Sequence, residues 1–172
     1  MNGPLYRFFA GDHRRLEGLL DRATAQPGEY EMEAYAEFRT GLLRHIKMEE
    51  KILIPTAQKA RGGEPLPIAA KIRLDHGAIT ALLVPSPSPT VVAALRKILS
   101  DHNVLEESPG GLYEMCEQLV GDEGESLLEK SKSTPPVPVN PYNDKPFVLE
   151  AARRALERAG YNFDGFAGGE KS

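Results

Sequence analysis

The sequence predicts an all-α protein, an up-down-up-down four-helix bundle followed by a proline-rich C-terminal arm and a short extra helix. Apolar residues recur at three- and four-residue spacing in four successive segments, and no segment shows the alternation that is typical of a strand. Breaks near residues 28, 63 and 87 separate these segments. One pattern also occurs twice, because D-H-x-x-[L/I]-x-x-L-L in one segment is followed by H-x-x-x-E-E in the next. Such an internal duplication indicates two matched helical hairpins.

The first hairpin joins helices that are predicted over residues 3–25 and about 30–61. Pro4 is well tolerated in a first turn, and the sequence Q-P-G ends the first helix. The second helix ends at R-G-G, where glycine commonly supplies a left-handed cap. Because Pro55 lies inside the second helix, we expect a kink or an early end there.

The second hairpin joins helices that are predicted over roughly residues 66–84 and from Thr90 onward. The sequence P-S-P-S-P between them cannot continue a helix and predicts a short rigid turn. Thr90 is a suitable N-cap for the fourth helix. The sequence S-P-G-G at 108–111 then breaks or bends this helix, and helical spacing resumes to about residue 120.

The chain is expected to divide into a bundle at residues 1–128 and an appended segment at residues 129–172. The segment from 131 to 146 contains five prolines and predicts an extended arm. Residues 147–159 then form a short amphipathic helix, which Gly160 ends. The apolar side of this helix must be buried, either against the bundle of the same chain or in a homodimer formed through the arm.

Composition and charge narrow the class of protein. The 172 residues are 41% hydrophobic and 27% charged, as in an ordinary soluble globular protein. A net charge of −4 argues against nucleic acid as the main partner. The single cysteine, Cys116, excludes an intramolecular disulfide and fits a reducing compartment. Since no segment approaches the ~20 apolar residues of a membrane span, and the N-terminus lacks a signal-peptide pattern, we expect a cytoplasmic protein without a membrane partner.

The four histidines of the chain all fall within the duplicated pattern. Positions four residues apart lie on the same side of a helix, so each histidine of H-x-x-x-E faces the same way as its glutamate. Counted from the three turns at about 1.5 Å per residue, all four imidazoles lie within about one turn of the same height. The predicted metal-binding site therefore consists of His13, His45, Glu49, His76, His102 and Glu106.

Four imidazoles and two carboxylates are more ligands than one tetrahedral zinc ion needs. They suit two five- or six-coordinate transition ions that share the carboxylates, with positions left for solvent or a small ligand. Nitrogen-rich ligation with bridging glutamates favours two iron ions, with manganese or zinc as other occupants. Taken singly, a histidine on an apolar face is more often a core residue, and E-E is more often a solvated charge face. The repeated order and common height favour the metal site.

The acidic neighbours of these residues are weaker candidates. Asp12, Asp75 and Asp101 each precede a histidine, and one residue along a helix corresponds to a rotation of about 100°. These carboxylates therefore cannot easily bond the imidazole beside them. Each could orient a histidine on a neighbouring helix, but a surface salt bridge is the favoured role. Glu50 and Glu107, which follow the two candidate glutamates, are expected to face solvent or nearby cations.

The duplicated motifs over about residues 5–120 resemble the hemerythrin-like (HHE cation-binding) family. The resemblance implies a four-helix bundle that holds a non-haem di-iron centre, with Glu49 and Glu106 as the bridging carboxylates. It also implies that the six residues of the predicted site are the iron ligands.

The sequence departs from the oxygen-carrying hemerythrins, which have a fifth histidine one turn from that of the third helix. Here the corresponding positions hold Ile72 and Thr80. Those carriers also use an aspartate bridge at a longer spacing, in place of Glu106 at i+4. Glu17, four residues after His13, is only a weak extra candidate, since the duplicated position is Thr80. Reversible oxygen carriage is therefore not expected.

The ligand set is more similar to that of the repair-of-iron-centres proteins, which respond to nitric oxide and oxidative stress. They usually carry a small cysteine-bearing N-terminal domain, which is not seen in this sequence. The favoured hypothesis is a di-iron protein that reacts with or senses O2, NO or peroxide, in stress response or iron handling. The alternative is a helical interaction module whose metal site is purely structural, and a ferroxidase is a third hypothesis. Whether the protein is an enzyme stays open.

Overall fold

The computed structural model describes residues 2–170. Within this range every regular element of secondary structure is a helix, and there is no strand. The prediction of an all-α protein is therefore confirmed. Lys171 and Ser172, the end of the predicted appended segment, lie outside the described residues. None of the described helices is both long and apolar enough to cross a bilayer.

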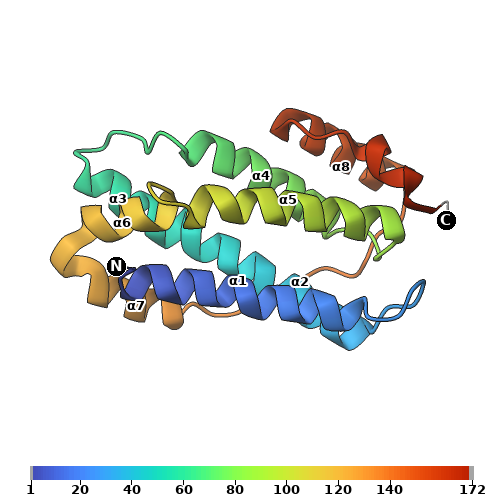
Figure 1. The fold of residues 1–172 in the computed structure, drawn as a ribbon, viewed down its shortest axis with the longest axis horizontal. Coiled ribbons are helices and arrows are strands. Elements are labelled where there is room, and N and C mark those ends of the chain that lie inside the picture. Colours follow the sequence, from blue (N-terminus) through green and yellow to red (C-terminus); the bar gives the residue numbers. More distant parts are fainter. Residues whose placement is uncertain (1, 171–172) are drawn as a thin grey trace.

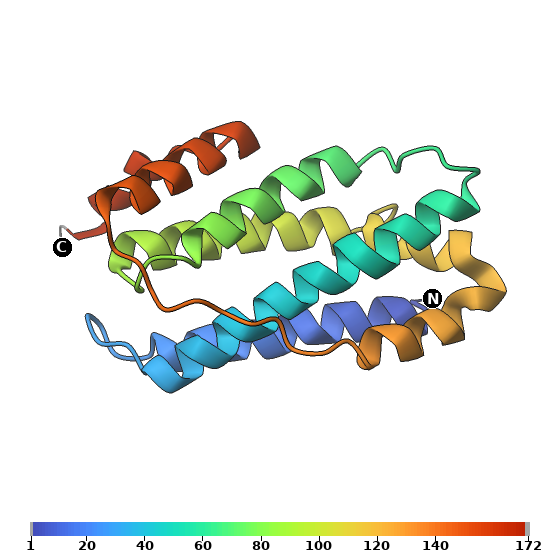
Figure 2. The same cartoon turned by 180° about the vertical axis from the view of Figure 1, so that it is seen from behind.

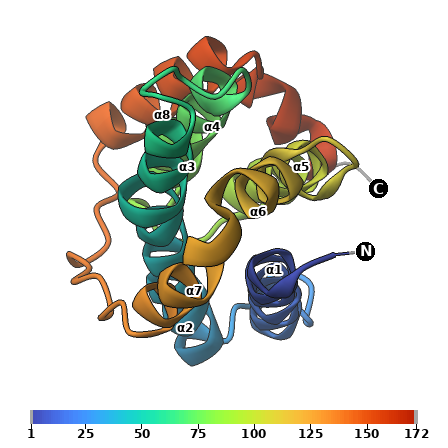
Figure 3. The same cartoon turned by 90° about the vertical axis from the view of Figure 1, so that its left-hand side faces the viewer.

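Four long helical units lie side by side, and successive units run in opposite directions (Figures 1 and 2). They are α1, α2 with its continuation α3, α4, and α5. Short helices α6 and α7 cover one end of this group, and α8 lies outside α4 (Figure 3). The α-helices are α1 (Pro4–Ala23), α2 (Met32–Met48), α3 (Ile54–Ala60), α4 (Ala69–Leu82), α5 (Pro89–Glu107), α6 (Leu112–Val120), α7 (Gly124–Lys132) and α8 (Pro146–Ala159). The other helical segments are the π-helix Glu49–Leu53 and the 3-10 helices Gly121–Glu123 and Phe163–Glu170.

Pro55 does not end the second helical unit. Instead, the turns before it widen into the π-helix, in which the N–H of Ile54 donates to the carbonyl of Glu49, five residues earlier. Proline has no N–H to donate, and in an α-helix its ring would clash with the carbonyl of Lys51. The local change from α to π geometry absorbs this conflict, and the helix continues to Ala60.

Two other boundaries differ from the predictions. The N-cap of α5 is Ser88 and not Thr90, because the Ser88 hydroxyl accepts a hydrogen bond from the N–H of Val91 and Pro89 takes the first helical position. Helix α7 was not predicted, since Leu127 is its only buried hydrophobic residue and its apolar periodicity is weak.

The predicted arm is extended and lies against α2 (Figure 2). At its start, the guanidinium of Arg44 donates to the carbonyl of Thr134. Further on, the guanidinium of Arg39 lies 4.4 Å from the centre of the Tyr142 ring. These contacts guide the chain from α7 across the group of long helices to α8.

Helix α8 buries its apolar face against α4 of the same chain. Ala152 and Leu156 are fully buried, whereas Phe147, the first residue of the predicted helix, is 64% exposed. Of the two predicted ways to cover this face, the structure shows burial within the chain. The end of α8 is held by Lys71, whose ammonium group donates to the carbonyl of Ala159 at 2.7 Å.

The buried apolar side chains form two separate clusters. On α1, Leu5 and Phe9 belong to one cluster, and Leu16 and Leu20 belong to the other. The histidine of α1, His13, lies between these two pairs in the sequence. The histidines of α2 and α4 likewise lie between residues of the two clusters, and beyond His102 of α5 the second cluster continues in α6. The buried polar groups therefore form a layer between two apolar clusters.

Candidate metal centre

The structure brings all six residues of the predicted site together in the buried layer between the long helices. Each is at most 4% exposed. They form two overlapping groups that could hold metal ions, and within each group the ligand atoms lie within 4.8 Å of one another. One group is His13, His45, Glu49 and Glu106, and the other is Glu49, His76, His102 and Glu106.

The two glutamates belong to both groups because each directs its two oxygens to histidines of different helices. In the H-x-x-x-E pairs, one oxygen meets the histidine four residues earlier, and the other meets a histidine of a neighbouring hairpin. The Nε2-to-oxygen distances are 3.1 Å for His45 and Glu49 Oε1, 3.1 Å for His76 and Glu49 Oε2, 3.1 Å for His102 and Glu106 Oε1, and 3.3 Å for His13 and Glu106 Oε2. Each glutamate thus presents one oxygen to a histidine of either group, as a carboxylate that bridged two metal ions would.

The second glutamate of each E-E pair bonds a histidine of another helix. Nδ1 of His76 lies 2.8 Å from Oε1 of Glu50, and Nδ1 of His13 lies 2.6 Å from Oε1 of Glu107. The expectation that Glu50 and Glu107 face solvent or cations alone is therefore wrong. Consecutive residues point about 100° apart on a helix, so the first glutamate faces the centre while the second reaches the adjacent helix.

Two of the three aspartates that precede a histidine also face a histidine of another helix. Oδ2 of Asp12 is hydrogen-bonded to Nδ1 of His45 at 2.9 Å. Oδ2 of Asp75 lies 3.5 Å from Nδ1 of His102, an ion-pair contact without a hydrogen bond. Asp12 and Asp75 thus face histidines in addition to forming salt bridges with Arg15 and Lys71. Asp101, which is half-buried, pairs with Lys97 as favoured. A carboxylate can only accept hydrogen bonds, so it fixes the imidazole with its hydrogen on Nδ1 and leaves Nε2 free to face the centre.

The donor atoms fit a metal ion better than they fit one another. Glu49 Oε2, His76 Nε2 and Glu106 Oε1 are buried without a hydrogen-bond partner among residues 2–170. The nitrogen of His76 and the Glu49 oxygen are only 3.1 Å apart, yet their directions do not make a hydrogen bond. Adjacent ligands of a transition ion, with bonds of about 2.1 Å, lie about 3 Å apart. Buried acceptors that converge at this separation need a cation.

Tyr113 of α6 is the residue that the sequence analysis missed. Its hydroxyl donates to Glu49 Oε1 at 2.6 Å and lies 3.0 Å from Glu106 Oε2. The same oxygen is 3.0 Å from His13 Nε2 and 3.2 Å from His45 Nε2. No motif marks this tyrosine, because it follows the S-P-G-G break and reaches the centre only when α6 folds back over the end of the long helices.

Gly111 makes this return of the chain possible. A Cβ at this position would lie 2.6 Å from the carbonyl oxygen of Leu105 and 2.7 Å from that of Glu106. Only glycine allows the backbone to pass so close to the end of α5. The turn makes Tyr113 the second residue of α6, and its hydroxyl contacts both Glu49 and Glu106.

The field of the two glutamates favours positive charge at the centre. Burial opposes protonation of His45, but Glu49 and Asp12 outweigh it and raise the pKa of the imidazole to about 10. Burial likewise opposes protonation of His102, and Glu106 with its neighbours raises this pKa to about 10. Burial alone would raise the pKa of Glu49, yet the surrounding histidines hold it well below the usual value. Two carboxylates thus stay ionised in a buried layer, where metal ions would neutralise them.

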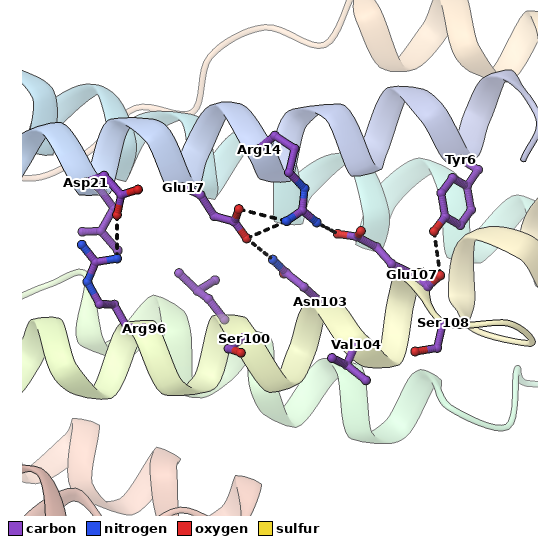
Figure 4. Close-up of a pocket in the computed structure, with 12 residues that line it drawn as sticks. Tyr6, Arg14, Glu17, Asp21, Arg96, Ser100, Asn103, Val104, Glu107 and Ser108 are labelled. Atoms are coloured by element: carbon purple, nitrogen blue, oxygen red, sulfur yellow. Dashed lines mark hydrogen bonds and ion pairs between the residues drawn. The ribbon is translucent and has the colours of Figure 1, made fainter.

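A groove of about 610 Å³ runs between α1 and α5 on the outer side of the centre (Figure 4). Arg14 lies across it and pairs with both Glu17 and Glu107. Asn103 donates to Glu17 from the opposite helix at 3.2 Å. Glu107 lines this groove and also bonds His13, so a single side chain links the groove to a candidate metal ligand.

A small chamber of about 20 Å³ lies beneath the groove. Glu17, Leu99 and Asn103 line both spaces and separate them. The volume is about that of one water-sized molecule. The remaining lining is apolar apart from three candidate ligands and consists of His13, Leu16, Leu42, His45, Ile46, Ile79 and His102.

No protein-family model, curated protein or solved structure matches this chain. The function is therefore argued from the geometry of the buried layer.

Proposed function

We propose that the protein is a hemerythrin-like di-iron protein that reacts with or senses O2, NO or peroxide. In this proposal α1, α2–α3, α4 and α5 form an up-down-up-down four-helix bundle around two iron ions. The observation that supports it most directly is the pair of buried four-residue groups that share Glu49 and Glu106. Two ions bridged by two carboxylates use every donor atom of the layer.

The residues of the chain hold and orient the ions. His13 and His45 would hold one ion and His76 and His102 the other, while Glu49 and Glu106 would serve both. The iron pair supplies the capacity to exchange electrons with a small ligand. The apolar clusters above and below exclude bulk water from this reaction.

The groove and the chamber support a small ligand over a large substrate. The chamber is small, about 20 Å³, which excludes a large substrate, and its apolar walls face the histidine side of the centre. Leu99 and the hydrogen-bonded pair of Glu17 and Asn103 separate it from the groove, so a small displacement of these side chains opens a path from solvent.

Metal analysis of untagged protein tests this proposal. Wild-type protein is expected to contain two iron ions per chain. Because Glu49 belongs to both groups, Glu49→Ala should lose both ions, whereas His76→Ala should lose mainly one. Glu17→Gln, which changes a neighbouring carboxylate outside both groups, should keep both ions. Fewer than one metal ion per wild-type chain would contradict the di-iron proposal.

Complete burial of both glutamates also favours a second candidate, a helical interaction module with a purely structural metal site. Reactivity separates the two candidates. The reduced di-iron protein should change its visible spectrum when it is mixed with oxygen, nitric oxide or peroxide. If the spectrum stays constant while chelation unfolds the protein, the structural candidate is correct.

A further inference from the structure

The hydroxyl of Tyr113 is about as far from the donor atoms of the group His13, His45, Glu49 and Glu106 as neighbouring donor atoms of this group are from each other. It lies 2.6–3.2 Å from Glu49 Oε1, Glu106 Oε2 and the Nε2 atoms of the two histidines of this group. The neighbouring histidine and glutamate atoms are themselves 3.1 and 3.3 Å apart. Atoms about 3 Å apart around a common point are adjacent ligands of one five- or six-coordinate ion.

The ring that carries this hydroxyl is fixed in place. Tyr113 is 1% exposed, and its ring is stacked on that of Phe9 with centres 5.3 Å apart and planes inclined by 27°. The ring of Tyr6 packs against it edge-on. A hydroxyl on such an immobilised ring keeps its position when an ion enters the layer beside it.

The second group has no counterpart to Tyr113. Among the residues that the structure describes, Glu49 Oε2, His76 Nε2 and Glu106 Oε1 have no hydrogen-bond partner, hydroxyl or other. The duplicated sequence therefore builds two unequal metal positions, because α6 follows only the second hairpin and delivers one tyrosine to one side.

We infer that Tyr113 is a phenolate ligand of the ion held by His13 and His45, so that the ion at His76 and His102 has one protein ligand fewer. The inference rests on the proposed di-iron function. On loading, the oxygen–hydrogen bond of the phenol breaks, the oxygen–iron bond forms, and the proton passes to solvent buffer. No electron is transferred in this step, and the charge of the ion stabilises the phenolate beside the two glutamates.

Spectroscopy of the protein loaded with ferric iron tests the inference. Wild type should show a visible phenolate-to-iron charge-transfer band, and excitation in this band should enhance the ring vibrations of a bound tyrosinate in the resonance Raman spectrum. Tyr113→Phe should keep two iron ions per chain and lose both signals. Tyr6→Phe is the matched control, since Tyr6 packs on the same ring but donates its hydroxyl to the carbonyl of Glu107. It should keep both signals.

The outcomes separate this inference from the proposed function. If wild type binds no iron, the di-iron function itself is wrong. If wild type binds two ions without a tyrosinate signature, or if Tyr113→Phe keeps the band, the ligand role of Tyr113 is wrong while the di-iron function stands. Should Tyr113→Phe fail to fold, the presence or absence of tyrosinate vibrations in wild type still decides the question.

Discussion

At the scale of single residues, each imidazole of the centre is held from two sides. Its Nε2 faces a shared glutamate, and its Nδ1 faces a carboxylate from another helix. Three of these outer carboxylates are paired in turn with a cation nearer the surface: Asp12 with Arg15, Asp75 with Lys71, and Glu107 with Arg14. Such chains fix the orientation and raise the basicity of metal-binding histidines.

The role of Asp12 can be tested against a matched aspartate. We expect Asp12→Asn to weaken metal binding by about 10–100-fold, because the amide is a weaker acceptor for the Nδ1–H of His45. Asp101→Asn is the control, since Asp101 also precedes a histidine but its carboxylate pairs with Lys97 and Tyr161. Competition with a chelator measures both affinities. Equal affinities of the two variants would show that the Asp12 contact does not support the site.

At the scale of helices, two irregular segments place the groups that regular helices would misplace. The π-helix starts at Glu49, and its wider turns accommodate Pro55 directly after His45 and Glu49, two of the candidate metal ligands. The turn at Gly111 sends α6 back across the end of α5 so that Tyr113 reaches the glutamates. In the first segment Pro55 rules out a regular α-helix, and in the second Gly111 allows a close approach of two backbone segments.

Helix α8 is also connected to the centre through Lys71. The ammonium group of Lys71 donates both to the carbonyl of Ala159 and to Asp75, the carboxylate that faces His102. The appended helix therefore supports one side of the buried layer, although it contributes no candidate ligand.

Truncation of the buried face of α8 should destabilise the protein. Leu156 is fully buried, so Leu156→Ala should lower the free energy of unfolding by about 2–5 kcal/mol through lost burial and a cavity. Leu149→Ala on the same helix is the control, and with 36% of the side chain exposed it should cost clearly less. Urea unfolding of both variants provides the comparison. If the two substitutions lowered the free energy of unfolding by the same amount, the buried face of α8 would not be packed on α4 in solution.

At the scale of the whole molecule, a polar layer with ionised carboxylates divides the apolar core into two clusters. Without metal ions, protonated histidines must balance these carboxylates. This makes the stability of the molecule depend on pH in a direction that the pKa shifts define.

The metal-free protein should be most stable in mildly acidic solution. The pKa values of His45 and His102 rise from 6.5 to about 10, so their stabilising contribution is complete below pH 6.5 and is lost as the pH rises toward 10. The pKa of Glu49 is lowered, so its contribution is present above pH 4.5 and is lost at more acidic pH. Thermal unfolding of chelated protein should therefore show a falling Tm above pH 6.5.

The metal-loaded protein provides the control for this pH dependence. Protons compete with metal ions for the same imidazoles, so the loaded protein should gain stability over the range in which the chelated protein loses it. A Tm of the chelated protein that rises from pH 6.5 toward 10 would contradict the charge balance described here.

Much of this arrangement can be read from local patterns. Periodic apolar residues predict the long helices, and the spacing of His45 to Glu49 follows from 3.6 residues per turn. The turns set the heights at which the four histidines meet, since helix length is proportional to residue number. By contrast, the partners of Glu50 and Asp12 lie on other helices, and rotation about each helix axis is decided by packing.

The sequence by itself determined the helical class of this protein and the set of six buried residues, because both depend on periodicity and on counting along the chain. Only the tertiary structure decided which carboxylate holds which imidazole, that α8 covers α4, and that Tyr113 enters the centre. These contacts join residues up to 100 positions apart, as between His13 and Tyr113. No local preference encodes such pairs, since they exist only once the helices have packed.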